Sequence, residues 1–207
     1  MTAFEHLLLR ARALAVPGER RVLGICGPPA SGKSTLAERM VRELGSRAVV
    51  VGMDGFHLAQ SELARLGRTD RKGAPDTFDV VGYLALLARI RAAEPDTVYA
   101  PRFRRDIEEP IACAVPIPPD LPLVVTEGNY LLHDEPPWHR VRDLLDEVWF
   151  LAPEEDERLR RLIARHMAFG RTAVEARRRA LGSDQRNADL ITATAHRADL
   201  VVSRCWR

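Results

Sequence analysis

Residues 27–35 have the types and spacing of a loop that binds phosphate groups. They fit the pattern G-x-x-x-x-G-K-[ST] and lie between a predicted strand and a predicted helix. Glycines let backbone N–H groups turn inward, and the start of the helix adds its positive end. We predict nucleotide binding by this loop, with Lys33 on the outer phosphates and Ser34 on Mg²⁺; the alternative is a turn that only caps the helix. Its residues are Gly27, Pro28, Pro29, Ala30, Ser31, Gly32, Lys33, Ser34 and Thr35.

Two carboxylates follow apolar strands elsewhere in the chain. Asp54 comes after a predicted strand at 47–52, and Glu127 comes after one at 121–126. Because parallel strands end at one edge of a sheet, both acids are expected to face the crevice that holds the phosphates. We assign Asp54 as the base for an attacking hydroxyl and Glu127 to the metal side. The alternatives are a helix cap for Asp54 and a surface loop position for Glu127.

Strand-like and helix-like segments alternate along the chain. Continuous apolar strands interleaved with helices indicate an α/β fold with a parallel sheet covered on both faces. Loops are expected at 67–79 and 101–120, on the edge of the sheet where ligands bind. The predicted helices cover 4–14, 33–44, 57–66, 80–92 and 154–168, and the predicted strands cover 21–26, 47–52, 121–126, 147–151 and 199–203.

Composition limits the class of protein. With 46% apolar and 29% charged side chains, the 207 residues are expected to form a single domain, 1–207. Because the net charge is only +2, we expect no nucleic-acid partner. Because no apolar run reaches about 20 residues, we expect no membrane partner. The widely spaced Cys26, Cys113 and Cys205 favour a reducing, cytoplasmic location. Lys33 and Lys72 are the only lysines among many arginines. At these two positions a compact ammonium could do what a forked guanidinium cannot.

Several motifs occur in the order seen in P-loop small-molecule kinases. Beside residues 27–35 they are 53–57 (MDGFH), 71–79 (RKGAPDTFD), 98–99 (VY) and 126–132 (TEGNYLL). The chain resembles the uridine kinase, phosphoribulokinase and bacterial pantothenate kinase group over nearly its whole length. It is most similar to proteins described as fructose transport system kinases. The resemblance implies a three-layer α/β/α P-loop NTPase fold with a mainly parallel sheet and a short helical lid.

The lid implied by the resemblance covers about 158–175. On the predicted helix, Arg158, Arg161 and Arg165 share a face through i+3 and i+4 steps. We expect Arg161 and Arg165 to act catalytically by spreading the charge of the transferring phosphoryl group. The alternative is a solvated face paired with neighbouring glutamates. The run 177–179 (RRR) is expected to lie on an exposed helix.

The acceptor is expected between Asp54 and the lid, where several side chains are candidates. Lys72 could meet the acceptor or the moving phosphate, or be a solvated loop lysine. Arg102 could bind an anionic or polyhydroxylated acceptor, or belong to a basic surface loop at 102–105. Asn187 is placed near the adenine by the resemblance. The remaining candidates are His57, Phe78, Tyr83, Phe103, Asn129 and Tyr130.

These expectations converge on ATP-dependent transfer of the γ-phosphoryl group to a hydroxyl of a small polar metabolite, a sugar such as fructose, with Mg²⁺ as cofactor. A pantothenate or nucleoside kinase is the first alternative. A P-loop ATPase or regulator coupled to a partner protein is the alternative from another class. The sequence leaves open whether the chain forms a homodimer.

Overall fold

A computed structural model describes residues 1–203, so Cys205 lies outside the described part. Its centre is a parallel sheet in the order β2-β5-β1-β6-β7. The strands are β1 (Arg21–Cys26), β2 (Ala48–Gly52), β5 (Leu123–Gly128), β6 (Glu147–Leu151) and β7 (Leu200–Val202). The predicted parallel sheet is therefore confirmed, and each predicted strand is found within two residues at either end.

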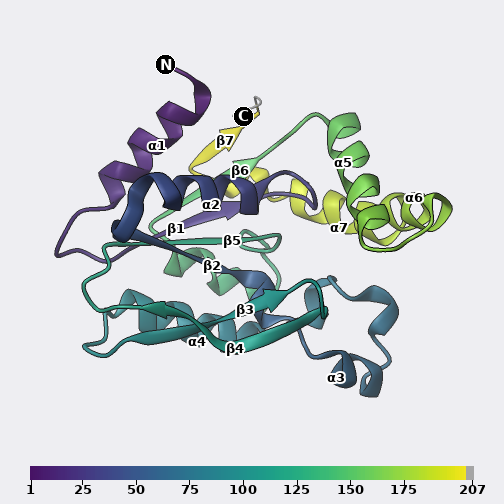
Figure 1. Cartoon of the computed structure of the whole chain (residues 1–207), viewed down its shortest axis with the longest axis horizontal. Coiled ribbons are helices and arrows are strands. Elements are labelled where there is room, and N and C mark those ends of the chain that lie inside the picture. Colours follow the sequence, from purple (N-terminus) through teal and green to yellow (C-terminus); the bar gives the residue numbers. More distant parts are fainter. Residues whose placement is uncertain (204–207) are drawn as a thin grey trace.

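Helices cover both faces of this sheet (Figure 1). On one face, α1 (Ala3–Leu14) and α2 (Lys33–Leu44) pack against alternate strand residues such as Leu23 and Trp149. On the other face, α4 (Val80–Arg91) packs against the intervening residues, such as Val22 and Phe150. Since successive strand side chains point to opposite faces, apolar residues at both parities require two covering layers. The three-layer α/β/α architecture is confirmed.

Three further helices lie together at one end of the molecule, on the right of Figure 1. They are α5 (Glu155–Ala168), α6 (Ala173–Leu181) and α7 (Ser183–Thr192). Gly170 has φ +87°, a left-handed conformation that ends the run of α5. The segment predicted as a lid thus consists of most of α5 and the start of α6.

The segment 101–120 differs from the loop that its prolines suggested. It belongs to an antiparallel hairpin of β3 (Val98–Arg104) and β4 (Glu109–Ile117). Val98, Ala100, Val115 and Ile117 are buried in the core beside α4. Prolines are tolerated here because a two-stranded hairpin has free edges, and the register shifts between Ala100 and Arg102.

The helix predicted at 57–66 is shorter in the structure, where α3 covers only Gln60–Arg65. The loop predicted at 67–79 contains the short 3₁₀ turns Thr69–Arg71 and Pro75–Thr77. The 3₁₀ turns of the described chain are Gly45–Arg47, Met53–Phe56, Thr69–Arg71, Pro75–Thr77, Trp138–Arg140, Arg142–Leu144 and Ala195–Arg197.

Within residues 1–203, no helix has both the length and the apolar character needed to cross a bilayer.

Candidate functional site

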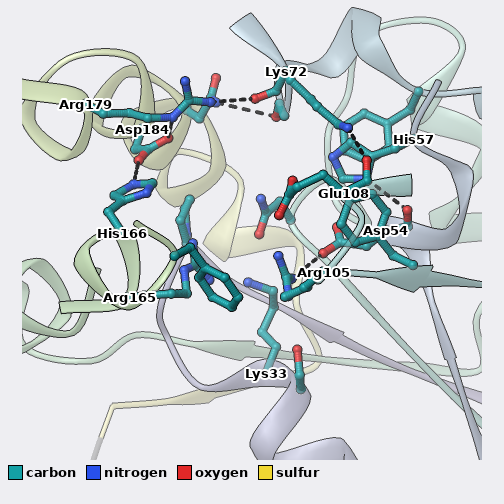
Figure 2. A pocket seen from close by; sticks show the side chains of 18 of the residues that line it. Lys33, Asp54, His57, Lys72, Arg105, Glu108, Arg165, His166, Arg179 and Asp184 are labelled. Carbon is teal, nitrogen blue, oxygen red and sulfur yellow. Dashed lines mark hydrogen bonds and ion pairs between the residues drawn. The ribbon is translucent and has the colours of Figure 1, made fainter. Parts of the chain in front are cut away.

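One cavity of about 490 Å³ collects most of the predicted site residues (Figure 2). It lies between the loop after β1, the segment after β2, the tip of the β3–β4 hairpin and the helices α5 to α7. The predicted residues that do not line it are Gly27, Pro28, Ala30, Ser31, Gly32, Thr35, Tyr83, Arg102, Tyr130 and Arg161. The predicted residues that do line it are Pro29, Lys33, Ser34, Asp54, His57, Lys72, Phe78, Phe103, Glu127, Asn129, Arg165 and Asn187.

The loop of residues 27–35 is shaped to receive phosphate oxygens. A Cβ atom on Gly27 would lie 2.7 Å from the carbonyl oxygen of Leu151, so only glycine fits there. The hydroxyl of Ser31 is buried and has no hydrogen-bond partner among the described residues. A buried orphan hydroxyl beside a helix start fits an anionic oxygen. The loop therefore fits a nucleotide phosphate.

Lys33 lies inside this loop. Its ammonium donates hydrogen bonds to the carbonyls of Gly27 at 2.9 Å and Pro28 at 3.1 Å. Burial lowers the pKa of Lys33 from its ordinary value. A buried ammonium is stabilised by an anionic partner, and the two carbonyls supply dipoles but no negative charge. Lys33 is therefore suited to bind a phosphate group.

Ser34 and Glu127 meet at the position predicted for the metal. The hydroxyl of Ser34 donates to Oε1 of Glu127 at 3.0 Å, and the glutamate is 9% exposed. Burial, reinforced by the nearby charge of Asp54, raises the pKa of the Glu127 carboxyl. A hydroxyl and a carboxylate are hard oxygen donors, the type that Mg²⁺ prefers. The pair therefore fits Mg²⁺ bound beside the phosphates.

Asp54 lies on the 3₁₀ turn Met53–Phe56, directly after β2. It does not cap a helix, since α3 begins at Gln60 and is preceded by Ala59 without a side-chain cap bond. Its Oδ2 accepts a hydrogen bond from Nη2 of Arg105 at 2.8 Å. Burial alone would raise the pKa of Asp54, but the charges of His57, Arg105, Lys33 and Arg165 bring it below the ordinary value. Asp54 is thus a carboxylate at neutral pH.

The arginines of α5 have separate roles. Arg165 lines the cavity and makes no side-chain hydrogen bond or ion pair within residues 1–203. Arg161 instead pairs with Glu157 one turn away. Arg158 is fully buried and pairs with Glu155, to which its Nε donates at 2.8 Å, as the alternative interpretation of this face predicted. It also donates to Oε1 of Gln185 at 2.6 Å and to the carbonyl of Pro29 at 3.4 Å. The three arginines predicted to share one face therefore differ: Arg165 lines the cavity, Arg161 pairs with a glutamate on the surface, and Arg158 is buried beneath the phosphate loop.

Lys72 and Gly73 are the point where the lid helices meet the opposite wall. The ammonium of Lys72 donates to the carbonyl of Glu108 at 2.6 Å, and the carbonyl of Lys72 accepts from Arg179 at 3.1 Å. Figure 2 shows this chain of contacts across the cavity. The expectation that residues 177–179 lie exposed is wrong for Arg179, which is half-buried and lines the cavity.

The carbonyl of Gly73 is held from two further sides. It accepts from the hydroxyl of Tyr130 at 2.6 Å and from the amide of Asn187 at 3.4 Å. Tyr130 is fully buried, so it supports the loop from below. Asn187 here contacts the loop predicted to serve the acceptor; its role toward adenine stays a prediction.

Aromatic rings form the floor beside Asp54. The ring of His57 lies 4.1 Å from that of Phe78 and 4.9 Å from that of Phe103, measured between centroids. Tyr83 is buried in the core, where its hydroxyl lies 2.7 Å from that of Thr126. Of the aromatic candidates, His57, Phe78 and Phe103 therefore reach the cavity.

Sequence reasoning missed Arg105, Arg179, His166 and Asp184 as cavity residues. His166 and Asp184 pair at 2.6 Å between α5 and α7. A hairpin at 98–117 would have placed Arg105 in its turn, directly after the strand that carries Phe103. The positions of the other three depend on how the lid helices pack, which no local pattern reveals.

Comparison with known proteins agrees with this geometry. Residues 22–206 match the model of the "Phosphoribulokinase / Uridine kinase family". A Schizosaccharomyces pombe protein provisionally described as a uridine kinase is 31% identical over 184 residues, covering 84% of this chain and 78% of that protein. The uncharacterized YggC of Escherichia coli is 31% identical over 201 residues, covering 94% and 82%.

Among solved structures, similarity extends over the whole fold. A Silicibacter sp. TM1040 protein provisionally described as a fructose transport system kinase has a TM-score of 0.86 and 32% identity, covering 98% of this chain and all of that one (100%). The family match, the relatives and the cavity thus point the same way. The chain belongs to the phosphoribulokinase/uridine kinase family of P-loop kinases.

Proposed function

We propose that the protein transfers the γ-phosphoryl group of ATP to a hydroxyl of a small polar metabolite, a sugar such as fructose. The observation that carries this proposal is the common cavity of the phosphate loop and Asp54. A site that only hydrolyses nucleotide has no need of an aromatic and polar compartment beyond the base. The name of the Silicibacter neighbour supports a sugar acceptor, whereas relatives named for uridine and pantothenate supply the alternatives.

The nucleotide half of the mechanism rests on the phosphate loop. Lys33 would exchange its bonds to the Gly27 and Pro28 carbonyls for the outer phosphates, gaining a charged partner. Ser34 and Glu127 would hold Mg²⁺, which when bound neutralises phosphate charge. The buried Ser31 hydroxyl would donate to a phosphate oxygen.

The acceptor half rests on Asp54. As a carboxylate it orients the attacking hydroxyl and receives its proton while the new oxygen–phosphorus bond forms. Arg165, free of any partner in the described chain, would contact the phosphoryl group from the lid side. The rings of Phe78 and Phe103 offer flat apolar faces, and Asn129 and His57 offer polar groups to a hydroxyl-rich molecule.

A cavity of about 490 Å³ lies within the range of small-ligand sites, about 300–1,000 Å³. It therefore suits a metabolite together with the phosphate end of the nucleotide. A cytoplasmic location belongs to the same proposal, since that compartment supplies ATP.

An acceptor screen tests the proposal. Purified protein with Mg-ATP is given fructose, other sugars, nucleosides and pantothenate one at a time, and ADP release is followed against a blank without acceptor. Asp54→Asn serves as the inactive control, and mass spectrometry identifies the phosphorylated product. Stimulation by a sugar supports the proposal. Stimulation by a nucleoside or by pantothenate would mean that this compound, and not a sugar, is the acceptor. Hydrolysis that needs no acceptor and is accelerated by a partner protein would mean that the protein is a partner-coupled ATPase.

A further inference from the structure

We propose that Arg105, from the tip of the β3–β4 hairpin, is a catalytic residue that bridges Asp54 and the phosphoryl group during transfer. This inference rests on the proposed function and adds a second arginine, opposite the lid, to its machinery. The hairpin would then contribute to the chemistry as well as to the wall of the acceptor compartment.

Most of the hydrogen-bonding capacity of Arg105 is unused within the described residues. A guanidinium has five N–H donors, and here Nη2 alone is engaged, with Oδ2 of Asp54 at 2.8 Å. Nε and Nη1 have no hydrogen-bond partner within residues 1–203, and the side chain lines the cavity. Figure 2 shows the Arg105 side chain between Asp54 and Lys33. The free donors are therefore available on the path between nucleotide and base.

The charge of Arg105 acts on three groups that line the same cavity. Burial is the main influence on the pKa values of Asp54, His57 and Arg165, and the positive charge of Arg105 lowers all three. Arg105 therefore lies close enough to act on both the base and the lid arginine.

The tip of the hairpin is held in place by hydrogen bonds from Lys72 and Gln60. Lys72 donates to the carbonyl of Glu108 at 2.6 Å, and the backbone N–H of Gln60 donates to Glu109 at 2.9 Å. The guanidinium of Arg105 also lies 5.6 Å from the centre of the Phe103 ring. A donor fixed before the reaction stabilises developing charge without the cost of reorganisation.

The proposed step is balanced without any covalent bond to Arg105. The acceptor oxygen forms a bond to the γ-phosphorus, the bond from phosphorus to the β,γ-bridging oxygen breaks, and the acceptor proton passes to Asp54. Arg105 donates hydrogen bonds to Asp54 and to the phosphoryl oxygens, whose charge is greatest in transit. A planar guanidinium can serve two partners at once, whereas a lysine ammonium has no such fork.

Steady-state kinetics form the first test, using the acceptor identified above. Arg105→Ala is expected to lower kcat by about 10²–10³-fold, with the KM values for ATP and acceptor changed by less than about threefold. Arg105→Lys should recover only part of this loss, and added guanidinium ion should partly rescue Arg105→Ala. Arg65→Ala is the control, since this exposed arginine on α3 pairs with Glu62 and does not line the cavity. A raised acceptor KM with unchanged kcat would make Arg105 a binding residue and overturn the proposal.

Titration calorimetry with Mg-ADP, alone and with aluminium fluoride, forms a second test that needs no acceptor. Aluminium fluoride should tighten ADP binding to the wild type, because aluminium fluoride bound beside ADP imitates the transferring phosphoryl group. Arg105→Ala should lose most of this gain and keep its affinity for ADP alone, and Arg65→Ala should keep both. An equal gain in wild type and Arg105→Ala would overturn the inference and leave the kinase proposal standing. A wild type that gains nothing from fluoride would contradict the kinase proposal itself, and the inference with it.

Discussion

The hydroxyl of Ser34, at the start of α2, donates a hydrogen bond to Glu127, at the end of β5, at 3.0 Å. The contact arises because β1 and β5 are parallel neighbours that pair Cys26 with Gly128, so both strands deliver their following residues to one edge. Residues 93 positions apart in sequence thereby become two adjacent oxygen donors.

Glu127→Gln should weaken the use of Mg²⁺. The amide keeps an oxygen that can accept from Ser34 and loses the negative charge that attracts the cation. The Mg²⁺ concentration for half-maximal activity is expected to rise about 10–100-fold. Activity is measured over a Mg²⁺ series at fixed ATP, with Glu94→Gln, from a surface pair with Arg89, as the control. An unchanged Mg²⁺ dependence would remove Glu127 from the metal side.

Asp54→Asn should abolish turnover without affecting nucleotide binding. The amide cannot accept the acceptor proton, so kcat is expected to fall by about 10²–10⁴-fold. ADP affinity, measured by calorimetry, should stay near the wild-type value, because Asp54 belongs to the turn after β2 and is not part of the phosphate loop. A large loss of nucleotide affinity would mean that Asp54 serves the nucleotide rather than the acceptor.

The parts of the site that the sequence predicts are those fixed by local geometry or by sheet topology. Residues 27–35 form a continuous loop, and Asp54 and Glu127 are placed by the rule that parallel strands end together. Arg105 could not be separated from Arg102 by sequence alone, because its position depends on a hairpin that the prolines concealed. Arg179 reaches Lys72 through the packing of α6 against a loop 107 residues away, which no periodicity encodes.

Arg165 and Arg161 should differ in their effect on catalysis. Arg165 faces the cavity without a partner in the described chain, whereas Arg161 pairs with Glu157 outside it. Arg165→Ala is expected to lower kcat by about 10²–10³-fold, and Arg161→Ala by much less. Single-turnover rates with saturating ATP and acceptor provide the comparison. Equal losses would show that α5 rotates during the reaction and brings Arg161, predicted from sequence as catalytic, onto the phosphoryl group.

Lys72 and Arg179 should act as one unit. The Lys72 side chain fixes the hairpin tip, and the Lys72 carbonyl receives Arg179 from the lid. Lys72→Met and Arg179→Ala are each expected to raise the acceptor KM. In the double variant, the increase in KM should be smaller than the product of the two single increases. Initial rates over an acceptor series measure all three. Strict additivity would mean that Lys72 contacts the acceptor directly, as the sequence suggested, independently of the lid.

The thermal stability of the protein should fall as the pH is lowered through the range where histidines titrate. His133 is 4% exposed, and burial lowers its pKa below the ordinary value of about 6.5. The unfolded chain therefore binds this proton more readily than the folded one, so the stabilisation is complete above about pH 6.5 and decreases as pH falls toward the folded pKa. Tm measured between about pH 7.5 and pH 5.5 should decline less steeply for His133→Gln than for the wild type. The exposed His139→Gln should keep the wild-type slope; equal slopes in all three proteins would exclude His133 as the source.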